Sequence, residues 1–404
     1  MKKIISCILV LFLLCALACV GNNGKNDIVV EEPKTPATAT PSATVRPTGT
    51  PAPLTPEPTI YIPEDLVLSG QCGKNLTWTV DPYTSTLTIS GKGAMWDYSA
   101  WGKGFFPIWD YERSAPWIEL GDWFSAPEGG GERLFDRIVV EEGITTIGNS
   151  AFRYMELEQV SLPDSLKTIG ERAFFNCRIT SSFSIPENVT SIGKWAFAQI
   201  FVSEYIVDAK NKSYCTVDGV LFSKNMQQLI SYPSGKKVAE YTVPKSVKSL
   251  GDWAFCYSQF NLLILPHGLA QTGWCSLHGL ILSELRIPST VRNINKLSFE
   301  DVAIGTLIIP EGVKTITEEM FLSTIIERVI LPASLRTIEY AALEWFSEVY
   351  FLGRPPIVKM NDDELGYDNE NTILYYPREY EHLWDPDWAD EWYGYRIEAY
   401  DTLP

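Results

Sequence analysis

Residues that carry much of the metal and acid–base chemistry of proteins are scarce in this sequence. Three of the 404 residues are histidine, and none of the eight cysteines forms a C-x-x-C pair. Because protein zinc sites usually combine closely spaced Cys and His, we expect no metal site and no cofactor. Five cysteines lie beyond the N-terminal region and are interpreted mainly as small buried hydrophobic residues: Cys72, Cys177, Cys215, Cys256 and Cys275.

Familiar catalytic motifs are also missing. The sequence contains no G-x-S-x-G, no H-E-x-x-H and no phosphate-binding loop. Each of these motifs sets a nucleophile, a metal ligand or a phosphate cradle at a fixed spacing, so their absence argues against the enzymes that use them. We therefore predict that the protein is not an enzyme.

The sequence has fewer basic than acidic residues. Lys and Arg total 33 against 50 Asp and Glu, which gives a net charge of −17 and a pI of about 4.7. Nucleic-acid phosphates would be repelled by such a chain, so no nucleic-acid partner is expected. The same repulsion argues against adhesion to anionic lipid by charge alone.

A long apolar run occurs at the start of the chain. Lys2 and Lys3 precede the apolar residues 4–18, which are too few for a transmembrane helix and predict a signal peptide over 1–18. The run ends "ALAC". Ala18 before Cys19 resembles a bacterial lipobox, whose Cys carries a lipid anchor, whereas Ala16 and Ala18 together also fit ordinary signal cleavage. We favour lipidation of Cys19, hence a lipoprotein on the extracellular face of a bacterial membrane, or a secreted protein if Cys19 is not lipidated.

Two non-repetitive segments follow. Residues 19–66 are rich in Pro and Thr and predict a lipid-anchored linker without a packed core. Residues 67–130 predict a small N-terminal β-rich aromatic module, because "LTWTV" and "TLTIS" alternate apolar and polar residues around a polar turn. Its Trp and Tyr residues, among them Trp101, fit either the aromatic core of a small cap or a platform for sugars; we favour the core.

Residues 131–352 repeat a single pattern. A proline recurs every 22 residues at Pro244, Pro266, Pro288, Pro310 and Pro332. Two earlier prolines, Pro163 and Pro186, lie 23 residues apart. Each proline follows apolar residues in the order Φ-x-x-Φ-x-Φ. An Ile or Leu lies six residues later, and then commonly Gly and an "AF" pair. A fixed period of this length is the signature of a leucine-rich-repeat solenoid, in which one unit cannot bury its apolar face alone.

The repeats predict an α+β repeat solenoid. Each unit of 22–23 residues is expected to form one short strand, a turn and a short helical or 3₁₀ return, with Gly permitting the turn and Phe pointing inward. The spacing of 58 between Pro186 and Pro244 predicts a hairpin insert at about 200–237, projecting from the solenoid. Residues 353–404 lose the period, are acidic, and predict a C-terminal cap.

The units "SLPDSLKTIGERAF" and "SIPENVTSIGKWAF" resemble the BspA-like leucine-rich repeats of bacterial surface proteins. The resemblance implies a non-catalytic solenoid at the cell surface that binds protein or extracellular-matrix partners in the manner of an adhesin. It carries no catalytic residues over to this chain.

The strand residues between the inward Φ positions are expected to face out on the concave sheet. In the second half of the repeats they mix apolar and charged side chains, which is typical of a protein-binding patch. The predicted ligand-binding residues are Leu262, Ile264, Glu284, Arg286, Ile308, Arg328, Ile330 and Tyr350. Two alternatives stay open: these residues merely favour strands, or a cap covers them. A glycan-binding module in the aromatic N-terminal region is the alternative function.

Overall fold

A computed structural model describes residues 66–98, 114–121, 133–291, 294, 297–317, 320–321, 323–359, 372–384 and 391–403. All of them belong to one compact unit, which spans Ile60–Pro404. The predicted signal peptide, Cys19 and nearly all of the linker lie outside the described residues. Among the described residues, no helix is long and apolar enough to cross a membrane.

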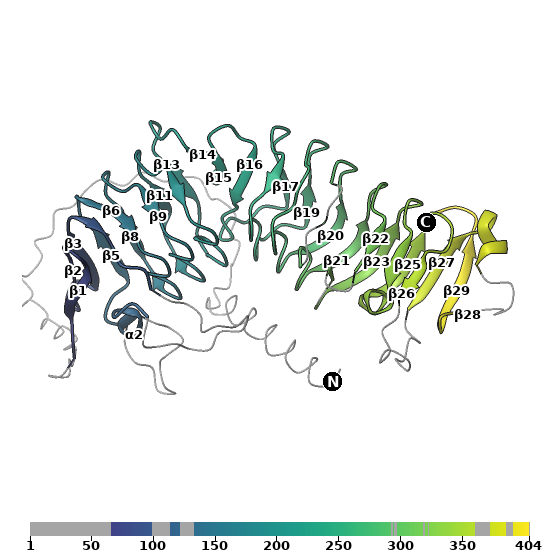
Figure 1. Ribbon diagram of the computed structural model, residues 1–404, viewed down its shortest axis with the longest axis horizontal. Helices are drawn as coiled ribbons and strands as arrows, with labels where there is room; N and C mark the ends of the chain where they lie inside the picture. Colours follow the sequence, from purple (N-terminus) through teal and green to yellow (C-terminus); the bar gives the residue numbers. More distant parts are fainter. Residues whose placement is uncertain are drawn as a thin grey trace, which may run out of the picture. The chain divides into compact units, whose positions relative to one another are not determined.

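The repeat strands stack side by side into parallel sheets (Figure 1). The largest sheet has nine strands, in the order β17 (Glu240–Thr242), β19 (Leu262–Ile264), β20 (Ile281–Arg286), β21 (Ala303–Ile308), β23 (Ile325–Leu331), β25 (Phe346–Phe351), β27 (Ile373–Pro377), β29 (Tyr395–Tyr400) and β28 (Glu391–Trp392). Earlier repeats contribute β5 (Arg137–Val140), β8 (Gln159–Ser161), β11 (Phe183–Ile185) and β13 (Tyr205–Val207). The predicted stack of 22-residue units is confirmed.

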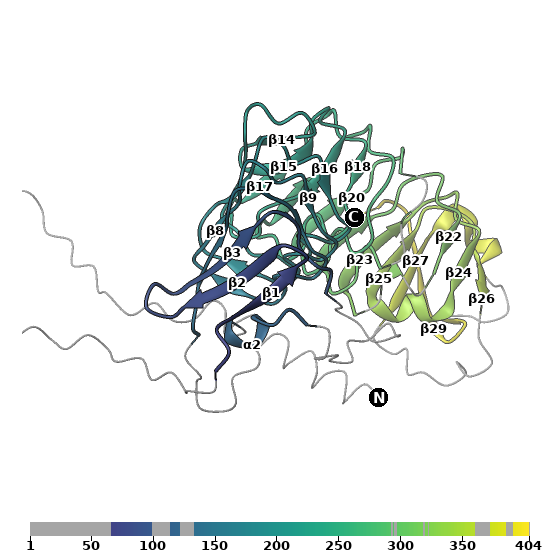
Figure 2. The same ribbon diagram turned by 60° about the vertical axis from the view of Figure 1, so that its left-hand side comes forward.

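The N-terminal hairpin is also confirmed. Strand β2 (Leu76–Asp81) pairs antiparallel with both β1 (Ser69–Gly73) and β3 (Thr86–Gly91). Strand β3 then pairs in parallel with the repeat strand β5, and Figure 2 brings these strands forward. Trp78 and Trp117 are buried in the same core as the first repeats. The described part of this module therefore covers the open end of the repeat core.

The helical return predicted for each repeat is wrong. Most coils return instead through turns and a second short strand, which includes the Ile or Leu six residues after the proline; the coil of Pro266 has only an isolated bridge there, at Gln271. These strands form further sheets from β4 (Gly93–Ala94), β6 (Ile144–Ile147), β9 (Thr168–Ile169), β12 (Ser191–Ile192), β18 (Ser249–Leu250), β22 (Thr315–Ile316), β24 (Thr337–Glu339) and β26 (Ile357–Lys359). A small pair, β7 (Glu156–Leu157) and β10 (Arg178–Ile179), lies at the turn before the repeat strand.

Backbone hydrogen bonding explains why the return is not helical. In the coil around Phe174, the N–H groups of Arg172, Phe174 and Asn176 donate to carbonyls of the next coil. Arg172 and Asn176 also have positive φ of 53° and 52°. An α-helix needs its N–H groups for its own carbonyls and rarely tolerates a left-handed residue, so a segment with both features cannot be helical.

Helix is accordingly rare among the described residues. It comprises the four-residue α2 (Ile118–Gly121), the two 3₁₀ turns η3 (Tyr340–Trp345) and η4 (Arg378–Leu383), and Met320. The protein is thus a β-solenoid rather than the α+β class expected from the sequence.

Phenylalanines from successive coils stack through the core. The rings of Phe152 and Phe174 lie 5.4 Å apart, and those of Phe299 and Phe321 lie at the same distance. All four side chains are fully buried. The inward direction predicted for the "AF" phenylalanines is confirmed, and the rings of Phe152 and Phe299 are covered by their equivalents in the next coil.

The insert joins the solenoid rather than projecting from it as predicted. It consists of β14 (Tyr214–Val217), β15 (Val220–Ser223) and β16 (Gln228–Ser231), which form an antiparallel meander. Strand β16 then pairs in parallel with β18 of the following coil. Phe222 and Leu229 are fully buried in the main core. The alternation of apolar residues in the insert supplies this buried face.

The C-terminal segment continues the nine-stranded sheet. Strands β27 and β29 pair in parallel with each other, and β27 pairs with β25. Trp384 is buried against Phe351 and Trp392, at ring distances of 4.7 and 5.0 Å. The acidic run at 361–371 lies outside the described residues. The described part of the predicted cap closes the core with aromatic side chains.

Candidate binding surfaces

The predicted ligand-binding residues lie on neighbouring strands in two rows. In the first row Leu262 pairs with Glu284, then Thr306, Arg328 and Glu348 follow in parallel register. In the second row Arg286 pairs with Ile308, then Ile330 and Tyr350 follow. Ile264 lies two residues beyond Leu262 on β19. We call these two rows, with Ile264, the strand face.

Exposure differs along the strand face. Ile264 is 41% exposed and Arg286 is exposed, while Leu262, Glu284, Ile308 and Arg328 are half-buried. Ile330 and Tyr350 are only 8% and 6% exposed, contrary to the expectation that they face solvent. Tyr350 is covered because its ring stacks on Tyr375 of β27, with centroids 4.4 Å apart. The accessible part of the strand face is therefore centred on β19 to β21.

Charges on the strand face are paired. The Arg286 Nε lies 2.6 Å from the Glu284 carboxylate, and the Arg328 guanidinium lies 2.9 Å from that of Glu348. Hydrogen bonding to Glu348 raises the pKa of Arg328 further. These groups are solvent-accessible, so the pairs contribute little stability. They set an alternating charge pattern beside Ile264 and Ile308.

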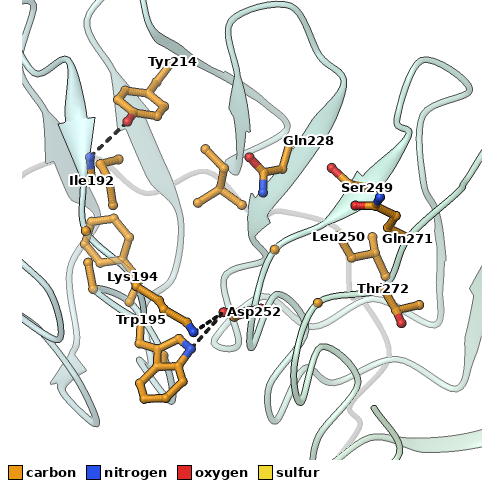
Figure 3. Close-up of a pocket in the computed structure, with 17 residues that line it drawn as sticks. Ile192, Lys194, Trp195, Tyr214, Gln228, Ser249, Leu250, Asp252, Gln271 and Thr272 are labelled. Atoms are coloured by element: carbon orange, nitrogen blue, oxygen red, sulfur yellow. Dashed lines mark hydrogen bonds and ion pairs between the residues drawn. The ribbon is translucent and has the colours of Figure 1, made fainter. Parts of the chain in front are cut away.

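A pocket lies beside the insert (Figure 3). Its volume is about 460 Å³, and residues of β12, β16 and β18 line it with parts of the turns that follow. Tyr214 accepts a hydrogen bond from the Ile192 N–H at one edge. Trp195 Nε1 donates to Asp252, and Lys194 lies 3.8 Å from the same carboxylate. The charged groups at the rim are thus paired with each other.

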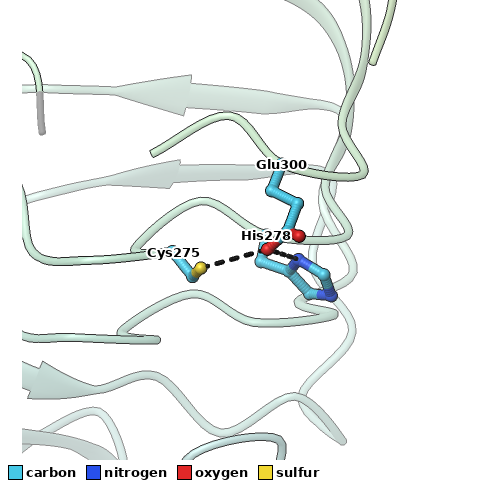
Figure 4. Close-up of side chains that lie close together, drawn as sticks. All are labelled: Cys275, His278 and Glu300. Carbon is cyan, nitrogen blue, oxygen red and sulfur yellow. Dashed lines mark hydrogen bonds and ion pairs between the residues drawn. The ribbon is translucent and has the colours of Figure 1, made fainter. Parts of the chain in front are cut away.

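Three metal-ligating side chains meet in the return turns between β19 and β21 (Figure 4). The Cys275 Sγ lies 3.2 Å from the Glu300 carboxylate, and His278 Nδ1 lies 3.6 Å from the same oxygen. Burial raises the pKa of the Cys275 thiol, and contact with His278 lowers the pKa of the Glu300 carboxyl. The Cys275 thiol donates its hydrogen bond to the Glu300 carboxyl group.

The comparison with protein families decides the identity of the repeats. The model described as "BspA type Leucine rich repeat region (6 copies)" matches residues 132–232 and 231–349. These matches cover more than half of the chain.

The protein belongs to the BspA-type leucine-rich-repeat family. The resemblance noted in the sequence is thereby confirmed. No curated protein matches the sequence.

Solved structures of bacterial repeat proteins are similar to this BspA-type chain in fold. A leucine-rich repeat protein from Eubacterium ventriosum is 18% identical, with 75% of this chain and 98% of that one covered and a TM-score of 0.42. The pneumococcal vaccine antigen PcpA is 17% identical, with 82% and 98% covered and a TM-score of 0.47. A leucine rich cell surface protein from Faecalibacterium prausnitzii is 18% identical, with 72% and 96% covered and a TM-score of 0.43.

The cysteine–histidine–glutamate cluster of this BspA-type protein was missed in the sequence. The expectation of no metal site rests on the absence of C-x-x-C pairs and the small number of histidines, whereas the pair here is Cys275-x-x-His278. The third group, Glu300, lies 22 residues after His278. The repeat period could have indicated that His278 and Glu300 are neighbours, since residues one period apart lie in contact on adjacent coils.

The aromatic N-terminal region is described only in part. Trp117 is fully buried and Tyr98 half-buried, whereas Trp96 is 47% exposed. Trp101 and its aromatic neighbours up to Tyr111 lie outside the described residues. The preference for an aromatic core over a sugar platform is supported at Trp117.

Proposed function

We propose that this BspA-type protein is a non-catalytic binding protein that recognises a protein or extracellular-matrix partner through the accessible part of its strand face. The family assignment supports a surface-displayed repeat protein, and the nine-stranded sheet supplies a continuous row of parallel repeat strands from β17 to β25. The partner would lie across β19, β20 and β21, where exposed Ile264 and half-buried Ile308 flank the Glu284–Arg286 pair.

The mixture of apolar and charged side chains on adjacent strands carries this proposal. Ile264 is 41% exposed although strand positions facing solvent on a soluble sheet are usually polar. Apolar residues supply most of the free energy of association, and the ring of charge around them limits the partners that fit. Such a face suits a folded partner better than a single sugar.

Two strand-face variants and one matched control test the proposed binding surface. The purified chain is screened by surface plasmon resonance against matrix proteins and a glycan array, together with Ile264→Asp, Ile308→Asp and Ile357→Asp. Ile357 is 70% exposed on β26, which belongs to a different sheet. A protein ligand whose affinity falls at least about tenfold in the first two variants, and is unchanged in the third, supports the strand face.

Two outcomes would count against it. A protein ligand insensitive to both strand-face variants would place the site elsewhere on the solenoid. A glycan ligand lost in Trp96→Ala and retained in Ile308→Asp would assign binding to the aromatic N-terminal region instead.

We also propose that Cys19 anchors the protein to the extracellular face of a bacterial membrane. The support is the sequence alone: basic Lys2 and Lys3, an apolar run, and Ala18 before Cys19. Radiolabelled fatty acid should be incorporated into the expressed chain and lost in Cys19→Ser, which should then partition to the soluble fraction. Membrane retention of that variant without label would reject lipidation.

A further inference from the structure

The geometry of the cluster formed by Cys275, His278 and Glu300 resembles a preformed cation site. All three ligand atoms lie within 4.8 Å of one another. The Glu300 Oε2 lies 3.2 Å from the sulfur and 3.6 Å from His278 Nδ1. In a tetrahedral zinc site with bonds of about 2.0–2.3 Å, ligand atoms lie roughly 3.3–3.8 Å apart. The two separations from the Glu300 oxygen lie close to this spacing, and the sulfur and Nδ1 lie within 4.8 Å of each other.

The histidine is held with one ring nitrogen directed at the cluster. His278 is 8% exposed, and its Nδ1 makes no hydrogen bond among the described residues. Its other nitrogen, Nε2, lies 3.2 Å from the Tyr257 hydroxyl, and its ring packs edge-on against Trp253. With Nε2 against the Tyr257 hydroxyl, Nδ1 is turned toward the Glu300 carboxyl group. Metal-binding histidines are oriented by such outer hydrogen bonds.

The repeat pattern shows that this site departs from the rest of the solenoid. His278 and Glu300 occupy one repeat position, twelve residues after the strand-ending proline, and earlier coils place Phe175, Ala198 and Cys256 there. Phe175 and Ala198 are buried, so the position normally contributes to a small apolar cluster on the return side. Replacing it with a histidine and a carboxylate in consecutive coils costs desolvation energy unless another group compensates.

Contacts within the protein offset only part of this desolvation cost. The Cys275 thiol hydrogen-bonds to Glu300, and the Asp301 carboxylate lies 3.9 Å from His278 Nε2. His278 Nδ1 lies 3.6 Å from the Glu300 carboxyl oxygen, which is too far for a hydrogen bond, and it makes none among the described residues. A cation bound among the three ligand atoms would satisfy that nitrogen and both neighbours at once.

We propose that Cys275 Sγ, His278 Nδ1 and Glu300 Oε2 bind a zinc-like divalent cation between two adjacent coils. The mixed sulfur, nitrogen and oxygen set suits Zn²⁺ better than Ca²⁺ or Mg²⁺, which prefer oxygen ligands. On binding, the Cys275 thiol loses its proton to solvent and the sulfur donates to the metal as thiolate. Three protein ligands leave a fourth position for water. The bound ion would join the coil of β19 to that of β20.

The test uses the full chain, first stripped with a chelator and then titrated with Co²⁺. We expect one Co²⁺ per chain, with thiolate-to-cobalt charge-transfer absorption that added Zn²⁺ displaces. Cys275→Ser should abolish the charge-transfer band. His278→Gln and Glu300→Gln should weaken Zn²⁺ binding by more than the roughly 10–100-fold that loss of an outer partner costs. Zn²⁺ should also raise the melting temperature of the parent chain.

Matched controls separate this site from the other thiols and histidines. Cys215→Ser changes a half-buried cysteine of the insert, and His267→Gln an exposed histidine; both should bind like the parent. Tyr257→Phe removes the hydroxyl that orients His278 while leaving all three ligands, so Zn²⁺ affinity should fall within the range of about 10–100-fold. Circular dichroism of the metal-free variants confirms that each is folded.

Two results would overturn the proposal. One is a folded parent chain that retains no Co²⁺ and shows no thiolate absorption. The other is a metal signal of the same strength in Cys275→Ser and His278→Gln. Either result would leave the cluster as a buried thiol–carboxylate hydrogen bond beside a histidine.

Discussion

At the scale of single residues, the glycine found seven residues after the strand-ending proline in several coils has a role different from the one expected. It was interpreted as permitting a turn, but these glycines have ordinary φ. A Cβ at Gly193 would lie 2.4 Å from the Glu171 nitrogen of the previous coil, and one at Gly273 would lie 2.3 Å from the Gly251 carbonyl. Gly is therefore needed because the backbones of adjacent coils approach too closely for a side chain.

This predicts that Gly193→Ala destabilises the protein. The added methyl group meets backbone atoms that cannot move aside, so we expect a loss of about 1–3 kcal/mol, measured by urea unfolding. Gly268→Ala is the control, because there the nearest atoms all belong to the flexible Lys248 side chain; its change should stay within about 0.5 kcal/mol. Equal losses in both variants would refute the close-approach explanation.

A second residue-scale feature joins neighbouring coils through carboxylates. Glu142 accepts the N–H groups of Asp164 and Ser165, and Glu311 accepts those of Ala333 and Ser334 in the same geometry. The bond from Asp164 is the main reason that the pKa of the Glu142 carboxyl is lowered. The same sequence pattern thus makes the same connection in two distant coils.

Acid should weaken the Glu142 connection. Because its folded pKa lies below the unfolded value of about 4.3, its stabilising contribution is present above that pH and is lost as the pH falls through the folded pKa. Glu142→Gln should therefore lower the urea midpoint at neutral pH and have a shrinking effect in acid. Exposed Glu141→Gln serves as the control; a pH-independent effect of Glu142→Gln would contradict the prediction.

At the scale of elements, the insert differs most from the sequence-based prediction, because it pairs with the solenoid instead of projecting from it. Its strands β15 and β16 were expected as hairpin arms, and they are. The sequence does not predict that these strands attach to the solenoid. The attachment is the pairing of β16 with β18, which belongs to a coil 18 or more residues later in the chain. Local alternation predicts that a segment is a strand, but not which distant backbone it will pair with.

The insert should consequently stabilise the whole unit. Phe222 is fully buried, so Phe222→Ala should cost about 3–5 kcal/mol and lower the main unfolding transition followed by circular dichroism. Val217→Ala is the control in the same insert, because Val217 is 44% exposed; it should change stability by about 0.5 kcal/mol or less. An unchanged main transition in Phe222→Ala would mean that the insert folds independently of the solenoid.

At the scale of the whole molecule, repetition makes the functional surface continuous. Each coil contributes one or two outward side chains, and parallel register aligns them with those of the next coil. The chemistry of the strand face is therefore set by few residues per repeat, and it can change without disturbing the buried Φ positions. The same arrangement brings His278 and Glu300 together, one period apart.

The sequence by itself determined the repeat, its period, the inward apolar and phenylalanine positions and the family, because one buried face recurs every 22–23 residues. It also predicted the N-terminal hairpin from alternation and a polar turn. Tertiary structure alone decided that the return is extended, because its N–H groups bond to the next coil. It decided likewise that Tyr350 is buried, since Tyr375, which stacks on it, lies on a strand outside the recognisable repeats. Contacts between coils, unlike patterns within one, require knowing which segments become neighbours.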